Sequence, residues 1–251
     1  MHQTSTKDIR DELARLLGEG KLTSVNREAA MTAIVGGSTI ELVGASFKAL
    51  DDALFGTVDW GYVAREDAWY RSMSRNVADI PGGAPTVWKA IAAKDGTINS
   101  NYGWCVFSAE NGAQFERVVA ELKANPESRR AVVIYTRPSM WDEYNAGGRA
   151  DFMCTNAVQY LVRDGAVHAC VQMRSNDAVL GYKNDRAWQH AVLVEVADRL
   201  GLPAGDLNWS VGSLHVYSRH FYLVDHYART GEKATTKERY RTLYPTSPYA
   251  L

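Results

Sequence analysis

The sequence predicts an α+β fold, because strand-like and helix-like segments are mixed without the strict alternation of doubly wound proteins. Two observations support this prediction. Segments 157–163 and 166–173 are rich in β-forming residues and flank Asp164-Gly165, a dipeptide typical of two-residue hairpin turns. Segment 187–200 is apolar on nearly all sides, as expected of a buried helix, and Gly201 follows it as a stop.

The remaining elements follow from helical and strand periodicities. Segment 114–124 is the clearest helix, because its apolar residues recur at i, i+3, i+4 and i+7 and Asn125-Pro126 follows it. In chain order, we expect a strand at 40–47, a helix at 62–75, the helix at 114–124, a strand at 131–135, the hairpin, the buried helix, a strand at 209–217 and a helix at 221–229 before Gly231.

Length and composition are those of a protein with a substantial core, at 251 residues and 46% hydrophobic. We expect one domain over residues 1–251, because no Pro-, Ser- or Gly-rich linker interrupts the pattern. The net charge of −1 indicates no general affinity for nucleic acid or anionic membranes, so an anion must be bound locally.

The N-terminus lacks a signal-peptide core, and no window approaches the roughly 20 apolar residues of a membrane span. The three cysteines show no disulfide or metal spacing, so we expect a cytoplasmic protein without a metal.

Cys154 is a candidate nucleophile. A single cysteine is more often a buried structural residue, but Cys154 follows Asp151 in a polar stretch at a strand edge. The Asp-Gly hairpin folds Arg174 back alongside it, and a nearby positive charge favours the reactive thiolate. From spacing alone, the catalytic and structural roles are about equally expected. Cys105 and Cys170 are expected in the core.

Several polar residues could bind an anion or a sugar. Arg174-Ser175 ends an apolar strand, and the arginine fork together with a hydroxyl donor suits a phosphate. For Arg129-Arg130 a solvated turn is the more common role, and phosphate binding is the alternative. His215 and Tyr217 alternate along a strand, so their polar tips point the same way. They could bind a sugar hydroxyl or be two satisfied core residues.

Two carboxylates complete the candidate site. Asp185 is expected at a helix start, where aspartate is a routine N-cap. Glu66 lies mid-helix among aromatic residues, where a carboxylate is retained either for proton transfer or as the partner of a nearby arginine or lysine.

These residues resemble the thymidylate synthase superfamily, and within it the phage-type deoxycytidylate (dCMP) hydroxymethylases. The resemblance extends over about residues 40–226. Its markers are Arg65-Glu66-x-x-Trp69-Tyr70, Asn99 to Trp104, Ser128-Arg129-Arg130, Tyr135 to Met140, Asp151 to Asn156, Met173 to Asp177 and Gly212 to His220. The resemblance implies a thymidylate synthase-like catalytic domain with a large mixed β-sheet, packed helices and a homodimer formed across the sheet.

The resemblance also implies roles for the candidate residues. Cys154 would add to C6 of the pyrimidine, and Glu66 would organise water and proton transfer. Positions that line the folate side or order catalysis match Trp88, Tyr102, Asp177, Leu180 and Gly181. The nucleotide 5′-phosphate would be held by Arg174, Ser175 and, from the partner subunit, Arg129 and Arg130. The sugar 3′-hydroxyl would be bound by His215 and Tyr217.

Two departures from the methylating synthases favour cytosine over uracil. Thr155 follows the cysteine where those enzymes have His, and Asp185 stands where they use Asn to read uracil. Cytosine offers an amino donor at N4 and an acceptor at N3, so a carboxylate that shares a proton with N3 complements it. Asp185 would then be a base reader as well as a cap. This predicts conversion of dCMP to 5-hydroxymethyl-dCMP with 5,10-methylenetetrahydrofolate and water.

Three alternatives remain open at the level of sequence. One is a CMP hydroxymethylase of a nucleoside-antibiotic pathway, one is a dUMP-methylating thymidylate synthase, and one is an inactive member that only binds nucleotide or a protein. Two segments lack a firm match to the family pattern. They are the N-terminal loop around Arg27, a possible phosphate ligand, and the C-terminal segment 244–251.

Overall fold

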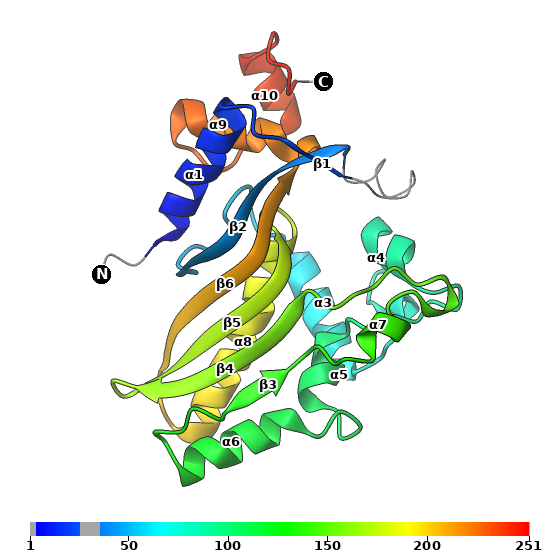
Figure 1. Cartoon of the computed structure of the whole chain (residues 1–251), viewed down its shortest axis with the longest axis vertical. Coiled ribbons are helices and arrows are strands. Elements are labelled where there is room, and N and C mark those ends of the chain that lie inside the picture. Colours follow the sequence, from blue (N-terminus) through cyan, green and yellow to red (C-terminus); the bar gives the residue numbers. More distant parts are fainter. Residues whose placement is uncertain (1–3, 26–35, 251) are drawn as a thin grey trace. The chain divides into compact units, whose positions relative to one another are not determined.

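The structure is a computed structural model that describes residues 4–25 and 36–250 (Figure 1). Its strands form a six-stranded sheet in the order β1-β2-β6-β5-β4-β3, and the predicted α+β class is confirmed. The strands are β1 (Thr23–Ser24), β2 (Ser38–Lys48), β3 (Val132–Ile134), β4 (Thr155–Arg163), β5 (Ala166–Asp177) and β6 (Ala204–Tyr217). The α-helices are α1 (Thr6–Gly18), α3 (Trp60–Ser72), α4 (Thr86–Ile91), α5 (Tyr102–Phe107), α6 (Gln114–Ala124), α7 (Met140–Glu143), α8 (Gly181–Leu200), α9 (Phe221–Thr230) and α10 (Lys237–Leu243). Short 3-10 turns are η1 (Val77–Asp79), η2 (Ala146–Gly148) and η3 (Ser218–His220).

The chain forms two compact units. Unit 1 comprises residues 1–58, 175–186 and 210–251, and unit 2 comprises residues 59–174 and 187–209. Strands β5 and β6 and helix α8 each run from one unit into the other. The expectation of one domain over residues 1–251 stays a prediction. In the described part of the chain, no helix combines the length and apolar character needed to cross a membrane.

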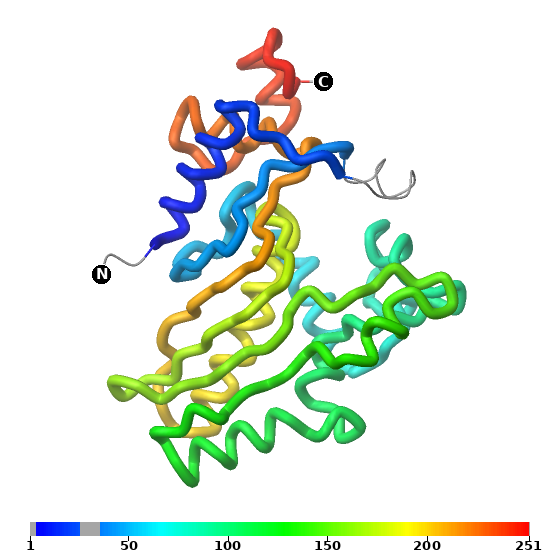
Figure 2. The backbone as a smooth tube through the Cα atoms, in the orientation of Figure 1, coloured from blue at the N-terminus to red at the C-terminus, as the bar shows by residue number. Residues whose placement is uncertain are grey.

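The β4–β5 hairpin of unit 2 confirms the prediction from Asp164-Gly165. The backbone of this hairpin can be followed through its turn in Figure 2. Asp164 and Gly165 have φ angles of 51° and 75°, the pair of positive values that a type I′ turn requires. The register pairs Arg163 with Ala166 at the turn and Thr155 with Met173 at the far end. The register shifts by one residue between Thr155 and Ala157, so the turn and this irregularity together determine which residues of β5 lie beside the start of β4.

In unit 2, α6 matches its predicted bounds and α3 is shifted at both ends, whereas α4, α5 and α7 were not predicted. Helix α6 spans the predicted residues and buries the apolar face that defined it, Phe115, Val118, Val119 and Leu122. Helix α3 begins at Trp60 and ends at Ser72 instead of spanning 62–75, because Asp59 caps its start and Met73 adopts a left-handed φ of 58°. Helix α5 packs closely on α3, since a Cβ at Gly103 would lie 1.7 Å from the carbonyl oxygen of Tyr70.

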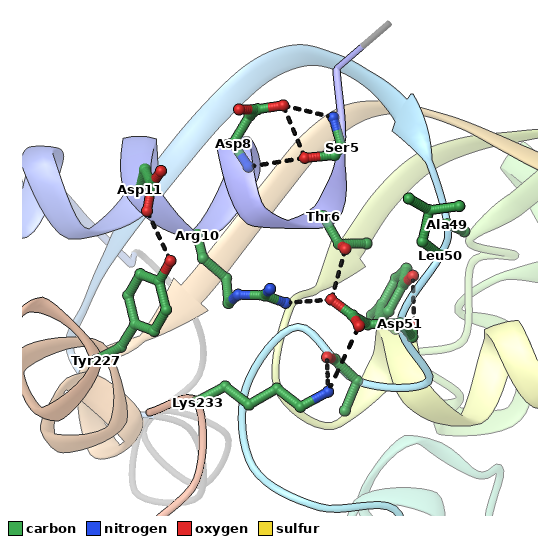
Figure 3. Close-up of polar contacts among 12 residues, drawn as sticks. Ser5, Thr6, Asp8, Arg10, Asp11, Ala49, Leu50, Asp51, Tyr227 and Lys233 are labelled. Atoms are coloured by element: carbon green, nitrogen blue, oxygen red, sulfur yellow. Dashed lines mark hydrogen bonds and ion pairs between the residues drawn. The ribbon is translucent and has the colours of Figure 1, made fainter. Parts of the chain in front are cut away.

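In unit 1, helix α1 contacts α9 and β2. Sequence analysis did not predict this helix, although Ser5 and Asp8 form a capping box at its start. Figure 3 shows how α1 is tied to the loop after β2: Thr6 Oγ1 and Arg10 Nη1 donate to Asp51 at 2.6 and 2.7 Å. The Tyr182 hydroxyl donates to the Asp51 backbone oxygen at 3.0 Å, so the same loop also holds the start of α8.

Helix α8 begins at Gly181 rather than at Ala187, which corrects two predictions. Asp185 is the fifth residue of the helix, so it lies inside the helix and is not its N-cap. The helix starts early because its first turns are held by tertiary hydrogen bonds: Arg186 Nε donates to the Ala49 oxygen at 2.9 Å and Lys183 Nζ to the Thr57 oxygen at 2.9 Å. The predicted stops are confirmed, with Gly201 at φ 68° after α8 and Gly231 at φ 77° after α9.

Candidate active site

The thiol of Cys154 lies directly before β4 and is half-buried. The hairpin register brings Arg174 beside it, with the Arg174 backbone N–H donating to the Cys154 oxygen at 2.9 Å. The guanidinium Nη2 lies 3.6 Å from the Cys154 sulfur. The predicted proximity of thiol and guanidinium is therefore present.

The Arg174 guanidinium is held by its surroundings. Its Nε donates to the Met153 oxygen at 2.9 Å, and its Nη2 donates to the Phe152 oxygen at 2.7 Å. Its carbon lies 5.1 Å from the centroid of the Phe152 ring. These contacts fix a positive charge next to the sulfur, which favours the thiolate, the nucleophilic form of cysteine.

Glu66 is almost completely buried in α3, at 5% exposure. The Tyr62 hydroxyl, one helical turn earlier, donates to Glu66 Oε1 at 2.5 Å. The Trp88 indole N–H donates to the same oxygen at 3.2 Å and to the Tyr62 oxygen at 2.9 Å. Burial raises the pKa of Glu66, while the two hydrogen bonds lower it by a smaller amount. The group can thus hold a proton nearer to neutral pH than an exposed glutamate can.

The alternative of an ionic partner for Glu66 is wrong for the described residues, where Tyr62 and Trp88 are its hydrogen-bond partners. The Tyr62 contact has a local signal that sequence reasoning could have used, since residues four apart share a helix face. The Trp88 contact comes from another helix and has no such signal.

The two aromatic candidates of unit 2 are packed into its core to different degrees. Trp88 is half-buried, and its ring meets Trp69 edge to face at a centroid distance of 5.5 Å. Tyr102 is buried as the first residue of α5 and stacks on Tyr70 at 5.4 Å. Asn101 caps this helix by accepting from the Trp104 N–H at 2.7 Å. Trp88 therefore keeps a partly exposed indole next to the buried carboxyl of Glu66.

In unit 1, Asp177 shapes the turn between β5 and α8. Its Oδ1 accepts from the N–H groups of Val179 at 2.8 Å and Leu180 at 3.3 Å. Leu180 is 38% exposed, and Gly181 begins the helix directly after it. Ser175 precedes this turn on β5 and is half-buried.

Asp185 has a partner that sequence reasoning missed. The side-chain Nδ2 of Asn176 donates to Asp185 Oδ2 at 2.7 Å, and Asn176 is only 3% exposed. Asn176 lies inside the marker segment from Met173 to Asp177, but nothing in the sequence shows that the turn folds it back onto the helix.

His215 and Tyr217 lie side by side on β6, as the alternation predicted. Their ring centroids are 4.8 Å apart and their planes are nearly perpendicular. Both are mostly buried, at 8% and 7% exposure. His215 Nδ1 lies 3.3 Å from Ser213 Oγ, and this hydroxyl also donates to Glu41.

Arg129 and Arg130 are exposed in the segment between α6 and β3. Arg130 Nη2 forms an ion pair with Glu121 at 3.0 Å, and its backbone N–H donates to Ser128 Oγ at 3.1 Å. This exposure fits the solvated turn and leaves the guanidinium of Arg129 accessible to a ligand or to another protein.

The other two cysteines differ from each other. Cys105 is buried as predicted, and burial raises the pKa of its thiol to about 12. The prediction of a core position is wrong for Cys170, which is half-buried because it lies on the face of β5 opposite the buried Ala169 and Val171. Arg27 lies outside the described residues.

The profile of the family described as thymidylate synthase matches residues 18–239. The chain belongs to the thymidylate synthase family. Among solved structures, this family member resembles thermostable thymidylate synthase A from Bacillus subtilis, with a TM-score of 0.58 and 25% identity, over 73% of this chain and 68% of that one.

The curated relatives of this thymidylate synthase family member carry two names, deoxycytidylate 5-hydroxymethyltransferase and thymidylate synthase. The deoxycytidylate 5-hydroxymethyltransferase of Enterobacteria phage T6 is 52% identical over 213 residues, 82% of this chain and 87% of that protein. The protein of the same name from Enterobacteria phage T4 is 51% identical over 212 residues, 82% of this chain and 86% of that protein. The thymidylate synthase of Francisella philomiragia is 28% identical over 173 residues, 65% of this chain and 63% of that protein.

Proposed function

We propose that this chain is a deoxycytidylate 5-hydroxymethyltransferase. The observation that supports this most directly is the 52% identity to the phage T6 protein of that name across most of both chains. The reaction adds the elements of formaldehyde to cytosine C5: dCMP, 5,10-methylenetetrahydrofolate and water give 5-hydroxymethyl-dCMP and tetrahydrofolate. No oxidant or reductant is consumed.

Cys154 is the proposed nucleophile. Its thiolate, favoured by the Arg174 guanidinium at 3.6 Å, adds to C6 of cytosine and makes C5 a carbon nucleophile. The bonds that Arg174 makes to main-chain oxygens use Nε and Nη2, so its fork retains further N–H donors for the 5′-phosphate, beside the hydroxyl of Ser175. Loss of the thiolate at the end of the reaction restores the ring.

Glu66 is the proposed group for proton transfer. Its raised pKa, which burial causes, lets the carboxyl exchange a proton with an ordered water near neutral pH. The proton removed from C5 leaves through this ordered water. A water molecule in the same place then supplies the hydroxyl that completes the product. Tyr62 and Trp88 hold Glu66 in one orientation.

Asp185 is the proposed base reader, and His215 and Tyr217 are the proposed ligands of the sugar 3′-hydroxyl. An aspartate can accept from the cytosine amino group and share a proton with N3, which neutralises charge as Cys154 adds to the ring. We expect Asp185→Asn to shift the ratio of kcat/KM from dCMP towards dUMP. An unchanged ratio would refute the base-reading role.

The folate co-substrate supplies a one-carbon unit at the oxidation level of formaldehyde. A partly exposed indole at Trp88, next to a buried carboxyl, fits a planar heterocycle that carries hydrogen-bonding edges. We propose that Trp88 and Tyr102, with Asp177, Leu180 and Gly181, bind and orient this co-substrate.

A homodimer formed across the sheet is also part of the proposal, with Arg129 and Arg130 reaching the phosphate in the partner subunit. Their exposure supports a role in contacting another molecule. The test is subunit complementation, in which inactive Cys154→Ser and Arg129→Ala/Arg130→Ala proteins are mixed after mild dissociation. Shared sites predict that activity returns on mixing, and activity that stays absent contradicts them. Because the curated hydroxymethylating relatives are phage proteins, we propose action in the cytoplasm of a host cell.

The deciding experiment incubates the protein with methylenetetrahydrofolate and, in turn, dCMP, CMP and dUMP, and measures product masses. We expect a gain of one CH2O unit on dCMP. A gain of one CH2 unit on dUMP, with dihydrofolate detected by absorbance, would make the chain a methylating synthase. Preferential reaction of CMP would identify a ribonucleotide enzyme, and no reaction with any of them would refute an enzymatic role.

A further inference from the structure

Asn176 is a buried amide that the mechanism above does not use. Its Nδ2 lies 2.7 Å from Asp185 Oδ2. An amide nitrogen can only donate, and an unprotonated carboxylate oxygen accepts more strongly than a protonated one, so this hydrogen bond favours the state in which Oδ2 carries no proton. A proton on the Asp185 carboxyl is therefore directed to Oδ1.

The pair has a defined geometry because the turn and the helix around it are fixed. Asp177 accepts two N–H groups of the turn, and the Ala178 N–H donates to the His215 oxygen at 2.8 Å. On the helix, Tyr182 and Arg186 bracket Asp185 and are bonded to the loop after β2. These contacts hold the backbone segments from which the two side chains meet.

Gly181 leaves the space in which the pair meets. A Cβ at this position would lie 3.1 Å from Asn176 Nδ2 and 3.5 Å from Asp185 Oδ2. Gly181 lacks the positive φ that usually explains a glycine, so the close approach of the two polar side chains is the reason that the structure offers for it.

We propose that Asn176 is a positioning residue that makes Asp185 select cytosine and reject uracil. This inference rests on the proposed function. With Oδ2 held unprotonated, Oδ2 accepts from the cytosine N4 amino group and Oδ1 shares its proton with N3. Uracil presents an acceptor at O4 and a donor at N3 instead.

The rejection of uracil follows from the proton position. A carboxyl protonated on Oδ2 would donate to uracil O4 and accept from N3–H through Oδ1, which is the pattern an asparagine offers. The Asn176 N–H opposes that protonation, because a protonated Oδ2 is a weaker hydrogen-bond acceptor than an ionised one. An aspartate alone can place its proton on either oxygen, and the hydrogen bond from Asn176 favours the placement that matches cytosine.

The test substitutes Asn176→Leu, which keeps the branched shape of the side chain and removes its donor. A hydrogen bond to a charged group corresponds to roughly tenfold or more in an equilibrium constant. We therefore expect the ratio of kcat/KM for dCMP over dUMP to fall by about tenfold or more. The loss for dCMP should appear in kcat rather than KM, because the shared proton acts as Cys154 adds to the ring.

Two controls separate positioning from general damage. Gln189→Leu removes another fully buried amide, one outside the proposed site, so any loss of activity there should leave the dCMP to dUMP ratio unchanged. In an Asp185→Asn background, Asn176→Leu should change the ratio by less than about twofold, since an amide carries its own fixed donor. If Asn176→Leu does not fold, Asn176→Ser, too short to reach Oδ2, carries the same expectation.

The outcomes distinguish this inference from the proposed function. If the unmodified protein does not hydroxymethylate dCMP, the proposed function fails. If it does, and Asp185→Asn changes the ratio while both Asn176 variants keep the original ratio, only the role of Asn176 is refuted. An equal effect of Asn176→Leu with and without Asp185→Asn refutes it as well.

Discussion

Replacement of Arg174 by glutamine tests the electrostatic basis of the nucleophile. The Arg174 Nη2 and the Cys154 sulfur are 3.6 Å apart, and Arg174 is exposed. Two unit charges at this distance, with the dielectric constant of water, attract each other by about 1.2 kcal/mol. Loss of the positive charge therefore lowers the thiolate population about sevenfold at a pH below the titration of the thiol.

The reaction rate changes less than the population, because a less stabilised thiolate is intrinsically more nucleophilic. With a Brønsted coefficient near 0.45, nucleophilicity rises by about 2.4-fold, and the net rate falls about threefold. The assay is the rate at which iodoacetamide modifies Cys154 near neutral pH without substrate, followed by mass spectrometry of the Cys154 peptide. Arg174→Lys keeps the charge and should retain most of the rate. Cys170 in the same protein is an internal reference.

Equal modification rates for Arg174→Gln and the unmodified protein would refute the reasoning. The guanidinium would then serve phosphate binding alone. An equal slowing of Cys170 would indicate general distortion of β5, on which Cys170 and Arg174 both lie, rather than loss of charge at one sulfur.

Three further predictions concern stability. Glu66→Gln keeps an oxygen for its two hydrogen-bond donors and removes a buried carboxylate, so it should lower kcat but raise the melting temperature. Because burial raises the folded-state pKa of Glu66, the unmodified protein loses stability as pH rises from the ordinary carboxyl range through that pKa. The advantage of Glu66→Gln in thermal unfolding should therefore be larger at pH 8 than at pH 5, and the reverse order would contradict this sign. Gly165→Val forces a β-branched residue to a φ of 75°, so calorimetry should show a loss of about 1–3 kcal/mol with normal kinetics, and an unchanged melting temperature would count against the turn geometry. Gly103→Ala places a Cβ 1.7 Å from a main-chain oxygen and should prevent soluble expression, whereas Gly18→Ala, with no atom within 4 Å, should be tolerated; well-folded Gly103→Ala protein would refute the close packing of α5 on α3.

Local properties of short segments explain the predictions that succeeded. Asp164-Gly165 can adopt the positive φ angles of a type I′ turn, and this local property sets the register of β4 and β5 from the turn as far as Ala157 and Gln172. The dipeptide therefore predicts that Arg174 returns to the neighbourhood of Cys154, and the register shift between Thr155 and Ala157 decides that the two residues lie directly opposite each other. Helix α6 was equally readable, because its periodic apolar face and its stop lie within one stretch.

Long-range contacts decided the rest. The first turns of α8 carry no apolar period, and they are helical because Tyr182 and Arg186 bond to a loop more than a hundred residues earlier in the chain, as separations of 131 and 137 positions show. Because α8 begins earlier than predicted, Asp185 lies inside the helix instead of at its N-cap, and its carboxylate accepts from Asn176.

The sequence by itself determined which chemical groups the chain contains, the hairpin and the amphipathic helix, since each depends on residues close together along the chain. The tertiary structure alone decided how those groups are hydrogen-bonded. In the folded chain, Trp88 donates a hydrogen bond to the buried Glu66, Cys170 is half-buried, and Asp185 accepts from the amide of Asn176. The physical reason is that burial and hydrogen-bond partners, which determine protonation and orientation, are set by segments distant in sequence.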